Sequence, residues 1–413
     1  MNILLANLTY LPHFGGIENS LRHISEIYKN EGHNVIIICS NIKPDKKGEL
    51  KDYEIINGIE VYRYKRFVPV FKFLKPFVNI TDIIKTYFLV KKLNLKYNFD
   101  FSIVRNMKVG IGLKFALKTK PVIYVLSSIT KFLDKKSLND FTGNQIMKFI
   151  KWFYHNKIII GQDVLFEKYL IRKSNLNIVF SKNMLNQVNQ LIKIDNRKIK
   201  LINPGVDSKR FFKKNNIIID ELKNQIKLDD FIFLILGRLI KVKGIDVAIK
   251  AFGRLNIPNT KLLIVGDGPE LNNLIELVNK MNLSERVIFL PKTTLPENYF
   301  SISDAFLMTS NYESFGQTIL EAMSSELPII GFKADNVNIK TATEEIIDDS
   351  KNGFLCENSI QDLANTMQKV MSLSEAEKRK IGKLNRNKVI YNFTWEGFSN
   401  EILEFESIKN SPK

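Results

Sequence analysis

Short apolar runs alternate with longer amphipathic stretches along nearly the whole chain, and this alternation limits the possible folds more than any other feature. Runs of this kind, separated by helical segments, are typical of buried parallel strands in α/β proteins. In the first half we expect strands at residues 2–7, 35–39, 101–104, 122–126 and 178–180, and a hairpin within residues 53–64 that turns at Asn57-Gly58. In the second half we expect them at residues 231–236, 262–265, 287–290, 305–308, 329–331 and 353–356. The sequence therefore predicts an α/β fold made of two doubly wound, Rossmann-like domains.

The boundary between the two domains is expected at the turn Asn203-Pro204-Gly205, which separates the two series of runs. We therefore place the first domain at residues 1–203 and the second at residues 204–385. A last helix, within residues 386–413, is expected to cross back to the first domain. Ligands of doubly wound sheets bind beyond the carboxyl ends of the strands, so the expected site is a cleft between the two carboxyl edges.

Composition excludes several classes of protein. The chain has 413 residues, 45% of them hydrophobic, which is typical of packed domains. No apolar run approaches the roughly 18 residues of a membrane-spanning helix, and the first residues do not resemble a secretory signal. Two cysteines and four histidines suggest neither a disulfide framework nor a metal site. We therefore expect a reduced, cytoplasmic protein.

The first half of the chain carries all of the excess positive charge. Residues 1–200 hold 34 Lys and Arg against 15 Asp and Glu, a balance of +19, whereas residues 201–413 hold 27 against 28, a balance of −1. Such a field attracts a polyanion, either a nucleic acid or the anionic surface of a membrane. A solvated basic face without a partner is the alternative.

Two glutamates eight residues apart, Glu313 and Glu321, are the first candidates for ligand binding. The segment after Ser314 has the composition of a helix, with Ser314 as the expected N-cap. Eight helical residues rise about 12 Å, roughly the distance from the sugar to the ribose of a nucleotide-sugar. The free amides at the start of this helix would point at an anionic group. They belong to Phe315, Gly316 and Gln317. Taken alone, such a pair of glutamates is usual on a solvated helix face.

A cationic loop follows the first predicted strand of the second domain directly. It begins with Gly237 and Arg238 and continues to Lys243. A guanidinium and an ammonium group at this edge of a sheet can neutralise a diphosphate and the charge that develops when it leaves. On its own, the loop is more typical of two surface cations without a ligand.

Two glycine-rich segments follow predicted strands. Gly15 and Gly16 offer a backbone without side chains, which a phosphate or sugar can approach closely. The segment Gly266-Asp267-Gly268 lacks the third glycine of a dinucleotide fingerprint, so it predicts a tight strand-to-helix turn and not a nicotinamide cofactor.

Six motifs in a fixed order carry information that none of them carries alone. They are His-Phe-Gly-Gly-Ile-Glu, Asn-Pro-Gly-Val-Asp, Gly-Arg-(x4)-Lys-Gly, Val-Gly-Asp-Gly-Pro-Glu, Glu-(x7)-Glu and Asn-Gly-Phe-Leu. This order resembles family 4 of the retaining nucleotide-sugar glycosyltransferases, over nearly the whole chain and most densely from Asn203 to Leu355. The resemblance implies a GT-B fold, in which two Rossmann-like domains face each other across a cleft. It also implies a retaining hexosyltransferase that uses a UDP- or GDP-sugar and no metal or other cofactor, in agreement with the lack of an Asp-x-Asp sequence.

The same resemblance implies a role for each candidate residue. Arg238 and Lys243 would hold the donor diphosphate, Glu313 and the amides after it would position the donor sugar, and Glu321 would hold the ribose. The implied catalytic residues are Glu313, Arg238 and Lys243. The implied donor-binding residues are Gly237, Ser314, Phe315, Gly316, Gln317 and Glu321.

In the first domain the resemblance points to the loops after two predicted strands. Gly15 and Gly16 would border the diphosphate and the acceptor. The family often has a histidine after the fourth strand, where this chain has Ser127 and Ser128, so we expect one of these serines to contact the sugar. A second departure is Glu326, at a position where glycine is frequent.

The function predicted from these motifs is a glycosyltransferase at the cytoplasmic face of the inner membrane, acting in surface polysaccharide or glycolipid biosynthesis. Its partners would be a nucleotide-sugar donor and a glycan or lipid-linked acceptor. One alternative is a soluble sugar or storage-polysaccharide transferase on the same fold. The other is a basic nucleic-acid-binding protein, which the lack of any nucleic-acid motif disfavours, so we expect no nucleic-acid partner.

Two stretches rich in aromatic and basic residues predict that the first domain binds an anionic membrane surface peripherally. Residues 61–75 read VYRYKRFVPVFKFLK and residues 148–157 read KFIKWFYHNK, both without an acidic residue. Aromatic rings suit the headgroup boundary, and cations contact lipid phosphates there. The cations expected to do so are Arg63, Lys65, Arg66 and Lys72. The alternative is that the rings are core residues of helices whose lysines face water.

Overall fold

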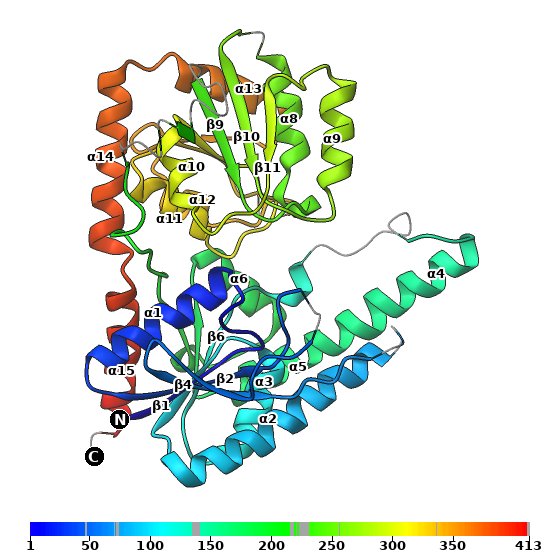
Figure 1. The fold of residues 1–413 in the computed structure, drawn as a ribbon, viewed down its shortest axis with the longest axis vertical. Coiled ribbons are helices and arrows are strands. Elements are labelled where there is room, and N and C mark those ends of the chain that lie inside the picture. Colours follow the sequence, from blue (N-terminus) through cyan, green and yellow to red (C-terminus); the bar gives the residue numbers. More distant parts are fainter. Residues whose placement is uncertain are drawn as a thin grey trace. The chain divides into compact units, whose positions relative to one another are not determined.

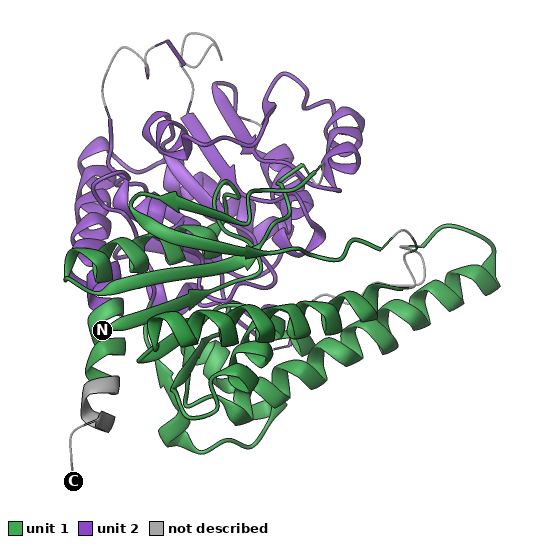
Figure 2. Cartoon of the chain, turned by 60° about the horizontal axis from the view of Figure 1, so that its bottom comes forward, with its two compact units in different colours: residues 1–203, 399–413 green, residues 204–398 purple. Residues whose placement is uncertain are grey.

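The structure, a computed structural model, divides into two compact units, which Figure 2 shows in two colours. It describes residues 1–45, 48–69, 71, 74–133, 141–214, 219, 221–222, 231–255, 257–335 and 337–410, the last five of these by their backbone alone. Unit 1 comprises residues 1–203 and 399–413, and unit 2 comprises residues 204–398. The division therefore falls at Asn203-Pro204. Residues 386–398 stay with unit 2, where Arg386 donates hydrogen bonds to the carbonyl oxygens of Phe211 and Ser324.

Unit 1 is built on an eight-stranded sheet in the order β3-β4-β2-β1-β5-β6-β7-β8 (Figure 1). The strands are β1 Asn2–Ala6, β2 Asn34–Ser40, β3 Tyr53–Ile56, β4 Ile59–Tyr64, β5 Phe101–Val104, β6 Val122–Val125, β7 Leu176–Val179 and β8 Ile199–Leu201. All neighbours pair in parallel except β3 and β4, which form a hairpin. Its turn residues Asn57 and Gly58 both have positive φ, the conformation that an Asn-Gly hairpin turn requires.

The helices of unit 1 connect successive strands of this sheet. They are α1 Gly16–Asn30, α2 Lys75–Tyr97, α3 Met107–Ala116, α4 Gln145–Phe153, α5 Ile160–Lys173 and α6 Lys182–Leu191. A π-helical turn, Tyr154–Ile159, joins α4 to α5 in one long helix. The chain returns at its end through α15, Trp395–Asn410, where the Tyr28 hydroxyl donates to the Ser399 carbonyl oxygen and Lys200 forms an ion pair with Glu401.

Unit 2 has a parallel sheet of six strands in the order β11-β10-β9-β12-β13-β14. They are β9 Phe231–Leu236, β10 Thr260–Val265, β11 Val287–Leu290, β12 Ala305–Met308, β13 Ile329–Phe332 and β14 Gly353–Cys356. Its helices are α8 Ile245–Arg254, α9 Leu271–Lys280, α10 Pro296–Ile302, α11 Gln317–Ser324, α12 Thr343–Ile346, α13 Ile360–Met371 and α14 Glu375–Asn392. Both sheets confirm the predicted α/β class with two Rossmann-like domains.

The predicted strands are confirmed, and most of them are apolar runs buried within their sheets, although β11 is only partly buried. The sequence missed β8, whose three residues Ile-Lys-Leu are only half-buried and give no continuous apolar run. At Glu326, where the family often has glycine, φ is +63°, so a glutamate occupies the left-handed region that glycine favours. Among the described residues, none of the helices combines the length and apolarity needed to cross a bilayer.

Two of the four cations expected to contact lipid are paired with carboxylates of unit 1, and one of the two is buried. Arg63 is only 3% exposed, and its guanidinium forms an ion pair with Glu54 at 2.5 Å. Arg66 forms an ion pair with the buried carboxylate of Asp82 at 3.0 Å. The prediction was wrong for Arg63, which is buried beside Glu54 of the neighbouring strand β3. For Arg66, whose side chain is one-fifth exposed, it stays a prediction. Lys65 is exposed, and Lys72 lies outside the described residues.

Candidate functional site

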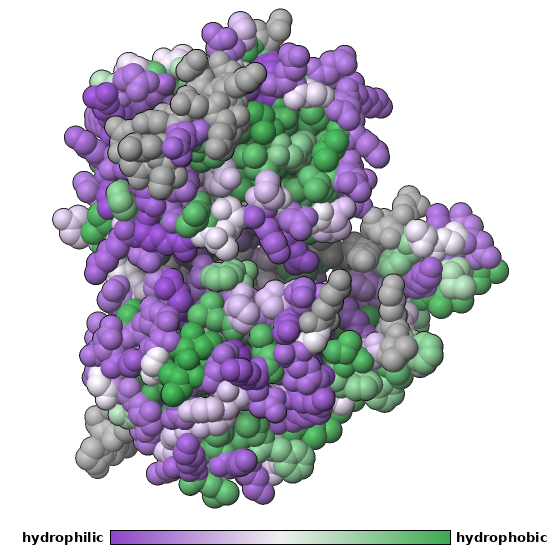
Figure 3. Space-filling view, in the orientation of Figure 1, coloured by the Kyte–Doolittle hydropathy of each residue, from purple (hydrophilic) through white to green (hydrophobic). Residues whose placement is uncertain are grey.

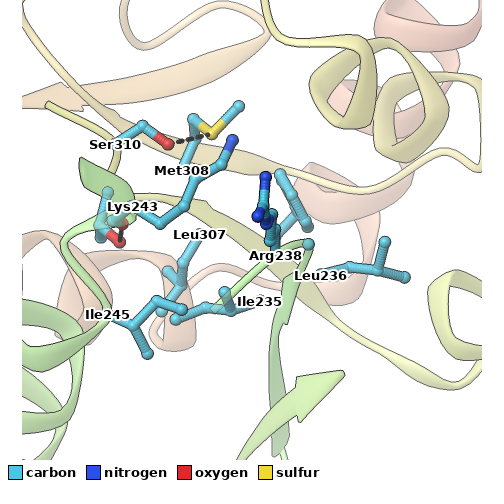
Figure 4. A pocket seen from close by; sticks show the side chains of 11 residues that line it. Ile235, Leu236, Arg238, Lys243, Ile245, Leu307, Met308 and Ser310 are labelled. Carbon is cyan, nitrogen blue, oxygen red and sulfur yellow. Dashed lines mark hydrogen bonds between the residues drawn. The ribbon is translucent and has the colours of Figure 1, made fainter. Parts of the chain in front are cut away.

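A pocket lies at the carboxyl edge of the unit 2 sheet, between the ends of the adjacent strands β9 and β12. It is lined by Ile235, Leu236, Gly237, Arg238, Lys243, Ile245, Phe306, Leu307, Met308, Thr309 and Ser310. Figure 4 shows the side chains of Arg238 and Lys243 entering the same space from one loop. The structure therefore brings together the two cations that the sequence singled out.

The loop that carries both cations is fastened to the loop after β12. The amide of Asn311 donates to the Val242 carbonyl oxygen at 2.7 Å, and the Thr309 hydroxyl donates to the Lys243 carbonyl oxygen at 2.9 Å. Gly244 has φ +59°, and a Cβ there would lie 2.2 Å from the Thr309 carbonyl oxygen. The contact therefore requires glycine at this position, which explains the glycine that follows Lys243.

The loop after β10 also packs against this cationic loop. A Cβ on Gly266 would lie 1.9 Å from the Gly237 carbonyl oxygen, and one on Gly268 would lie 2.2 Å from the Leu239 carbonyl oxygen. The two glycines thus allow two backbones to touch. This explains the Gly-Asp-Gly motif as a packing motif and confirms the expected tight turn between β10 and α9.

The two cations differ in their surroundings. Lys243 forms a short ion pair with the Glu313 carboxylate, and both side chains are about one-quarter exposed or less. Arg238 is exposed and forms no ion pair with any described residue. An anion that enters the pocket therefore meets one cation without a carboxylate partner and one that it must draw away from Glu313.

The segment between the two glutamates corrects the prediction for Ser314. The helix α11 begins at Gln317, and its N-cap is Gly316 with φ +105°, without a side-chain cap. Ser314 is therefore not the N-cap, and only five of the residues from Glu313 to Glu321 are helical. The estimate of 12 Å between the glutamates assumed a helix throughout and does not apply. The sequence signal that was missed is Gly316. Glycine readily adopts the left-handed conformation, and here it takes the N-cap position at which a serine was expected.

Two of the residues whose backbone amides were predicted to bind an anion also have side chains with structural contacts. Phe315 is buried and packs against the Phe393 ring, so it anchors the loop before α11. The side-chain amide of Gln317 donates to the Gly205 carbonyl oxygen at 2.7 Å. This contact joins the start of α11 to the Asn-Pro-Gly turn. The first backbone amides of α11 are those of Gln317 and Thr318.

Glu321 lies in a cluster of charged groups that the sequence did not reveal. The pKa of its carboxyl is raised to about 8, chiefly because of burial; the nearby Arg210 acts to lower this pKa and Glu297 to raise it. Arg210 in turn forms an ion pair with Glu297 at 2.8 Å and donates to the Thr294 carbonyl oxygen at 2.5 Å. No sequence signal connects Arg210 with Glu297, because the two residues are 87 positions apart.

The candidate residues of unit 1 lie at the carboxyl edge of its sheet, after β1 and β6. Gly15 is the N-cap of α1 with an extended backbone, and Gly16 is the first residue of that helix. Ser127 and Ser128 are half-buried in the loop after β6.

A buried carboxyl group forms hydrogen bonds with the end of the segment that contains the two serines. Glu167 of α5 accepts hydrogen bonds from the Thr130 amide at 3.0 Å and from the Thr130 hydroxyl at 3.2 Å. Burial raises the pKa of Glu167 to about 7, whereas these hydrogen bonds lower it. Glu167 is a further residue that the sequence did not reveal.

Comparison with known proteins assigns both parts of the chain to families. Residues 14–210 match "Glycosyltransferase Family 4", and residues 217–388 match "Glycosyl transferases group 1".

Three known proteins share between 24 and 28% sequence identity with this chain. N-acetyl-alpha-D-glucosaminyl L-malate synthase of Bacillus anthracis is 28% identical over 58% of this chain and 61% of its own length, which is less than two thirds of that protein. Alpha-monoglucosyldiacylglycerol synthase of Acholeplasma laidlawii is 26% identical over 86% of this chain and 84% of its own length. An alpha-1,3-galactosyltransferase of Escherichia coli, named for a diphosphoundecaprenol-linked acceptor and UDP-Gal, is 24% identical over 95% of this chain and 93% of its own length.

Two solved structures share the fold over almost the whole chain. Sucrose-phosphate synthase of Thermosynechococcus elongatus superposes with a TM-score of 0.77 at 19% identity and covers 99% of this chain and 98% of its own. HepE of Anabaena in complex with UDP-glucose superposes with a TM-score of 0.72 at 19% identity and covers 99% of this chain and all of its own (100%). These similarities show the GT-B fold.

Proposed function

Because the chain belongs to the group 1 and family 4 glycosyltransferases, we propose that it moves a hexose from a UDP- or GDP-sugar to a glycan or lipid-linked acceptor, with retention of the anomeric configuration. The observation that carries the proposal is the pairing of Lys243 with Glu313 beside the exposed Arg238. The group holds two cations for a diphosphate in the pocket, and the carboxylate that pairs with one of them is available for sugar hydroxyls. The relative named for UDP-Gal, and the similar structure of HepE in complex with UDP-glucose, support a nucleotide-sugar as the donor.

The diphosphate of the donor would bind Arg238 first, since this guanidinium has no carboxylate to leave. Lys243 would then exchange Glu313 for a phosphate oxygen. This exchange frees the Glu313 carboxylate to accept hydrogen bonds from the donor sugar. The backbone amides of Gln317 and Thr318 would add hydrogen-bond donors for the charged diphosphate, because the first amides of a helix have no partner within it.

The transfer itself needs no nucleophile from the protein in this proposal. The bond between the anomeric carbon and the diphosphate oxygen breaks, and the leaving oxygen takes the proton of the acceptor hydroxyl. The acceptor oxygen bonds to the anomeric carbon on the face that the diphosphate leaves. Arg238 and Lys243 stabilise the charge that develops on the diphosphate, and Glu313 holds the sugar in place.

The acceptor class rests on the relatives. The Acholeplasma protein is named for a glucosyldiacylglycerol and the Escherichia coli protein for a diphosphoundecaprenol-linked sugar. We therefore propose a lipid-linked acceptor in surface polysaccharide or glycolipid biosynthesis, and a place of action at the cytoplasmic face of a membrane. A panel of UDP- and GDP-sugars, followed by release of the nucleoside diphosphate, tests the donor class. If no nucleotide-sugar is hydrolysed or transferred, the proposal fails.

The stereochemical outcome and the metal requirement are tested together. We expect NMR of the product to show the same anomeric configuration as the donor. We also expect transfer to continue in the presence of a chelator, because two cationic side chains neutralise the diphosphate. A product of inverted configuration would contradict the retaining mechanism. A rate that falls with the chelator and returns with a divalent cation would contradict the metal-independent site.

The raised pKa of Glu321 predicts a pH dependence for donor binding. At pH 7 a carboxyl group with a pKa of about 8 is largely protonated, whereas ribose hydroxyls donate best to a carboxylate. Binding therefore releases the proton, and the affinity for UDP or GDP rises by about tenfold from pH 7 to pH 9. In Glu321→Gln, calorimetry should show a weaker affinity at pH 9 that changes little with pH, with kcat nearly intact. The same pH dependence in both proteins would contradict the ribose role.

A further inference from the structure

Helix α2 has two apolar faces, and only one of them is covered. The inner face is buried within unit 1, with Val78, Val90 and Leu93 among its buried residues. The outer face carries a second row of large apolar side chains, each between 42 and 84% exposed. This row, which we call the α2 stripe, consists of Phe77, Ile80, Ile84, Phe88 and Leu95. Its spacing of three, four and seven residues places all five on one side of the helix.

The exposed charged side chains of α2 itself are all positive. Lys91 and Lys92 are exposed and flank the stripe between Phe88 and Leu95. The one acidic residue of α2 is Asp82, which is fully buried and paired with Arg66. The outer surface of α2 therefore combines apolar side chains with cations and offers no exposed carboxylate.

Helix α4 presents a second surface of the same kind. None of its residues is buried, and Ile146, Phe149, Ile150 and Phe153 are between 47 and 73% exposed. No acidic residue occurs from Phe141 to Gln162. The continuation of α4 into α5 lies beside α2, where the Asn79 amide donates to the Gln162 side-chain oxygen at 2.7 Å. Figures 1 and 2 show the two long helices side by side. Figure 3 shows apolar residues gathered over this part of unit 1.

A soluble surface rarely carries so many large apolar side chains in one region, so a partner is expected to cover them. Interfaces between proteins are depleted in lysine at their centres, whereas the boundary of an anionic bilayer accepts apolar side chains and cations together. The excess of cations over acids in residues 1–200, +19, favours the same partner.

We propose that the α2 stripe and the exposed apolar side chains of α4 bind the surface of an anionic lipid bilayer. The side chains of the stripe enter the headgroup boundary, and Lys91 and Lys92 contact lipid phosphates. This surface replaces the one predicted around Arg63 and Arg66. The inference deepens the proposed function, because a lipid-linked acceptor lies in such a bilayer, but the binding itself requires neither donor nor acceptor.

Sedimentation with vesicles tests the proposal on the full chain. The vesicles are phosphatidylcholine with phosphatidylglycerol, or phosphatidylcholine alone. We expect binding to the anionic vesicles that weakens as salt is added. The triple variant Phe77→Ser, Ile84→Ser, Phe88→Ser should bind about a hundredfold more weakly, because three large side chains no longer enter the boundary. The matched control carries Leu384→Ser, Ile390→Ser and Tyr391→Ser on α14, where the side chains are also exposed, and should bind like the wild type.

The contribution of charge is measured separately. Lys91→Gln with Lys92→Gln should weaken binding by about twentyfold, since each cation near an anionic surface contributes several-fold to the affinity. The control Lys280→Gln with Lys351→Gln removes two exposed lysines of unit 2 and should have no effect.

Three results would overturn the proposal. They are equal binding to neutral vesicles, no binding to anionic ones, and equal losses in the stripe variant and its α14 control. Light scattering in the absence of lipid identifies the main rival: if the stripe variant alone dissociates a dimer, and vesicles are not bound, the stripe joins two copies of the chain. Release of UDP or GDP from the donor sugar, measured without lipid, tests the transferase separately and should be the same in the wild type and the stripe variant.

Discussion

Replacing Lys243 by alanine should lower kcat for sugar transfer by about two to three orders of magnitude, and replacing Arg238 by alanine should have an effect of similar size. Each substitution removes a cation from the pocket in which the leaving diphosphate would gain charge. A group that acts mainly on the developing charge affects the transition state more than the bound substrate, so kcat should fall more than KM rises. Steady-state kinetics with the preferred nucleotide-sugar measures both.

The design of this experiment has to account for Glu313. Lys243→Ala leaves the half-buried Glu313 carboxylate without its partner, so a loss of folding could imitate a loss of catalysis. The double variant Lys243→Ala, Glu313→Gln removes this carboxylate charge, and thermal unfolding confirms that the protein is folded. Lys241→Ala is the matched control, because Lys241 is an exposed cation of the same turn. Nearly normal kcat in both Lys243→Ala and Arg238→Ala would refute the assignment of the donor site.

Gly266→Ala should destabilise the protein by about 4 kcal/mol, because it forces apart two backbones that touch. The new Cβ would lie 1.9 Å from the Gly237 carbonyl oxygen, and φ of +155° is strained for any residue with a side chain. The substitution would also move the loop that carries Arg238, so activity should fall together with stability. Urea unfolding followed by circular dichroism measures the change in the free energy of unfolding.

Gly237→Ala separates the cost of backbone strain from the cost of the contact between the two loops. Gly237 has φ +154°, nearly the same as Gly266, but its Cβ would meet no atom within 4 Å. We therefore expect a loss of about 1–2 kcal/mol from backbone strain alone. The difference between the two variants measures the cost of the contact between the loops. Equal losses in both would show that the packing of the β10 loop on the β9 loop does not limit stability.

The strands and the position of the site followed from the sequence because both depend on local order along the chain. A run such as Phe231–Leu236 is apolar enough to be buried on both faces of a parallel sheet, wherever its neighbours come from. Residues that directly follow such a strand must emerge at its carboxyl edge. The place of Gly237 and Arg238 beside the pocket was therefore predictable, as was the hairpin turn at Asn57-Gly58.

Only the tertiary structure decided which charged side chains have partners. Arg63 and Arg66 look like surface cations in the sequence, but Glu54 pairs with Arg63 across the β3–β4 hairpin and Asp82 of α2 pairs with Arg66. The link between Arg210 and Glu297 joins segments that no local pattern connects. The physical reason is that an ion pair depends on distance in space, whereas a sequence motif records only distance along the chain.

The tertiary structure also decided which apolar side chains are exposed. Large apolar side chains lie on two sides of α2, and only the fold shows which side other elements cover. The packing of α3 and the rest of unit 1 buries Val90 and Leu93 and leaves Phe77 and Phe88 in contact with solvent. Local sequence determined the helix and its cations, since both depend on residues within a few turns. The folded unit alone determined that the α2 stripe is free to bind, because burial depends on what the rest of the chain brings against each face.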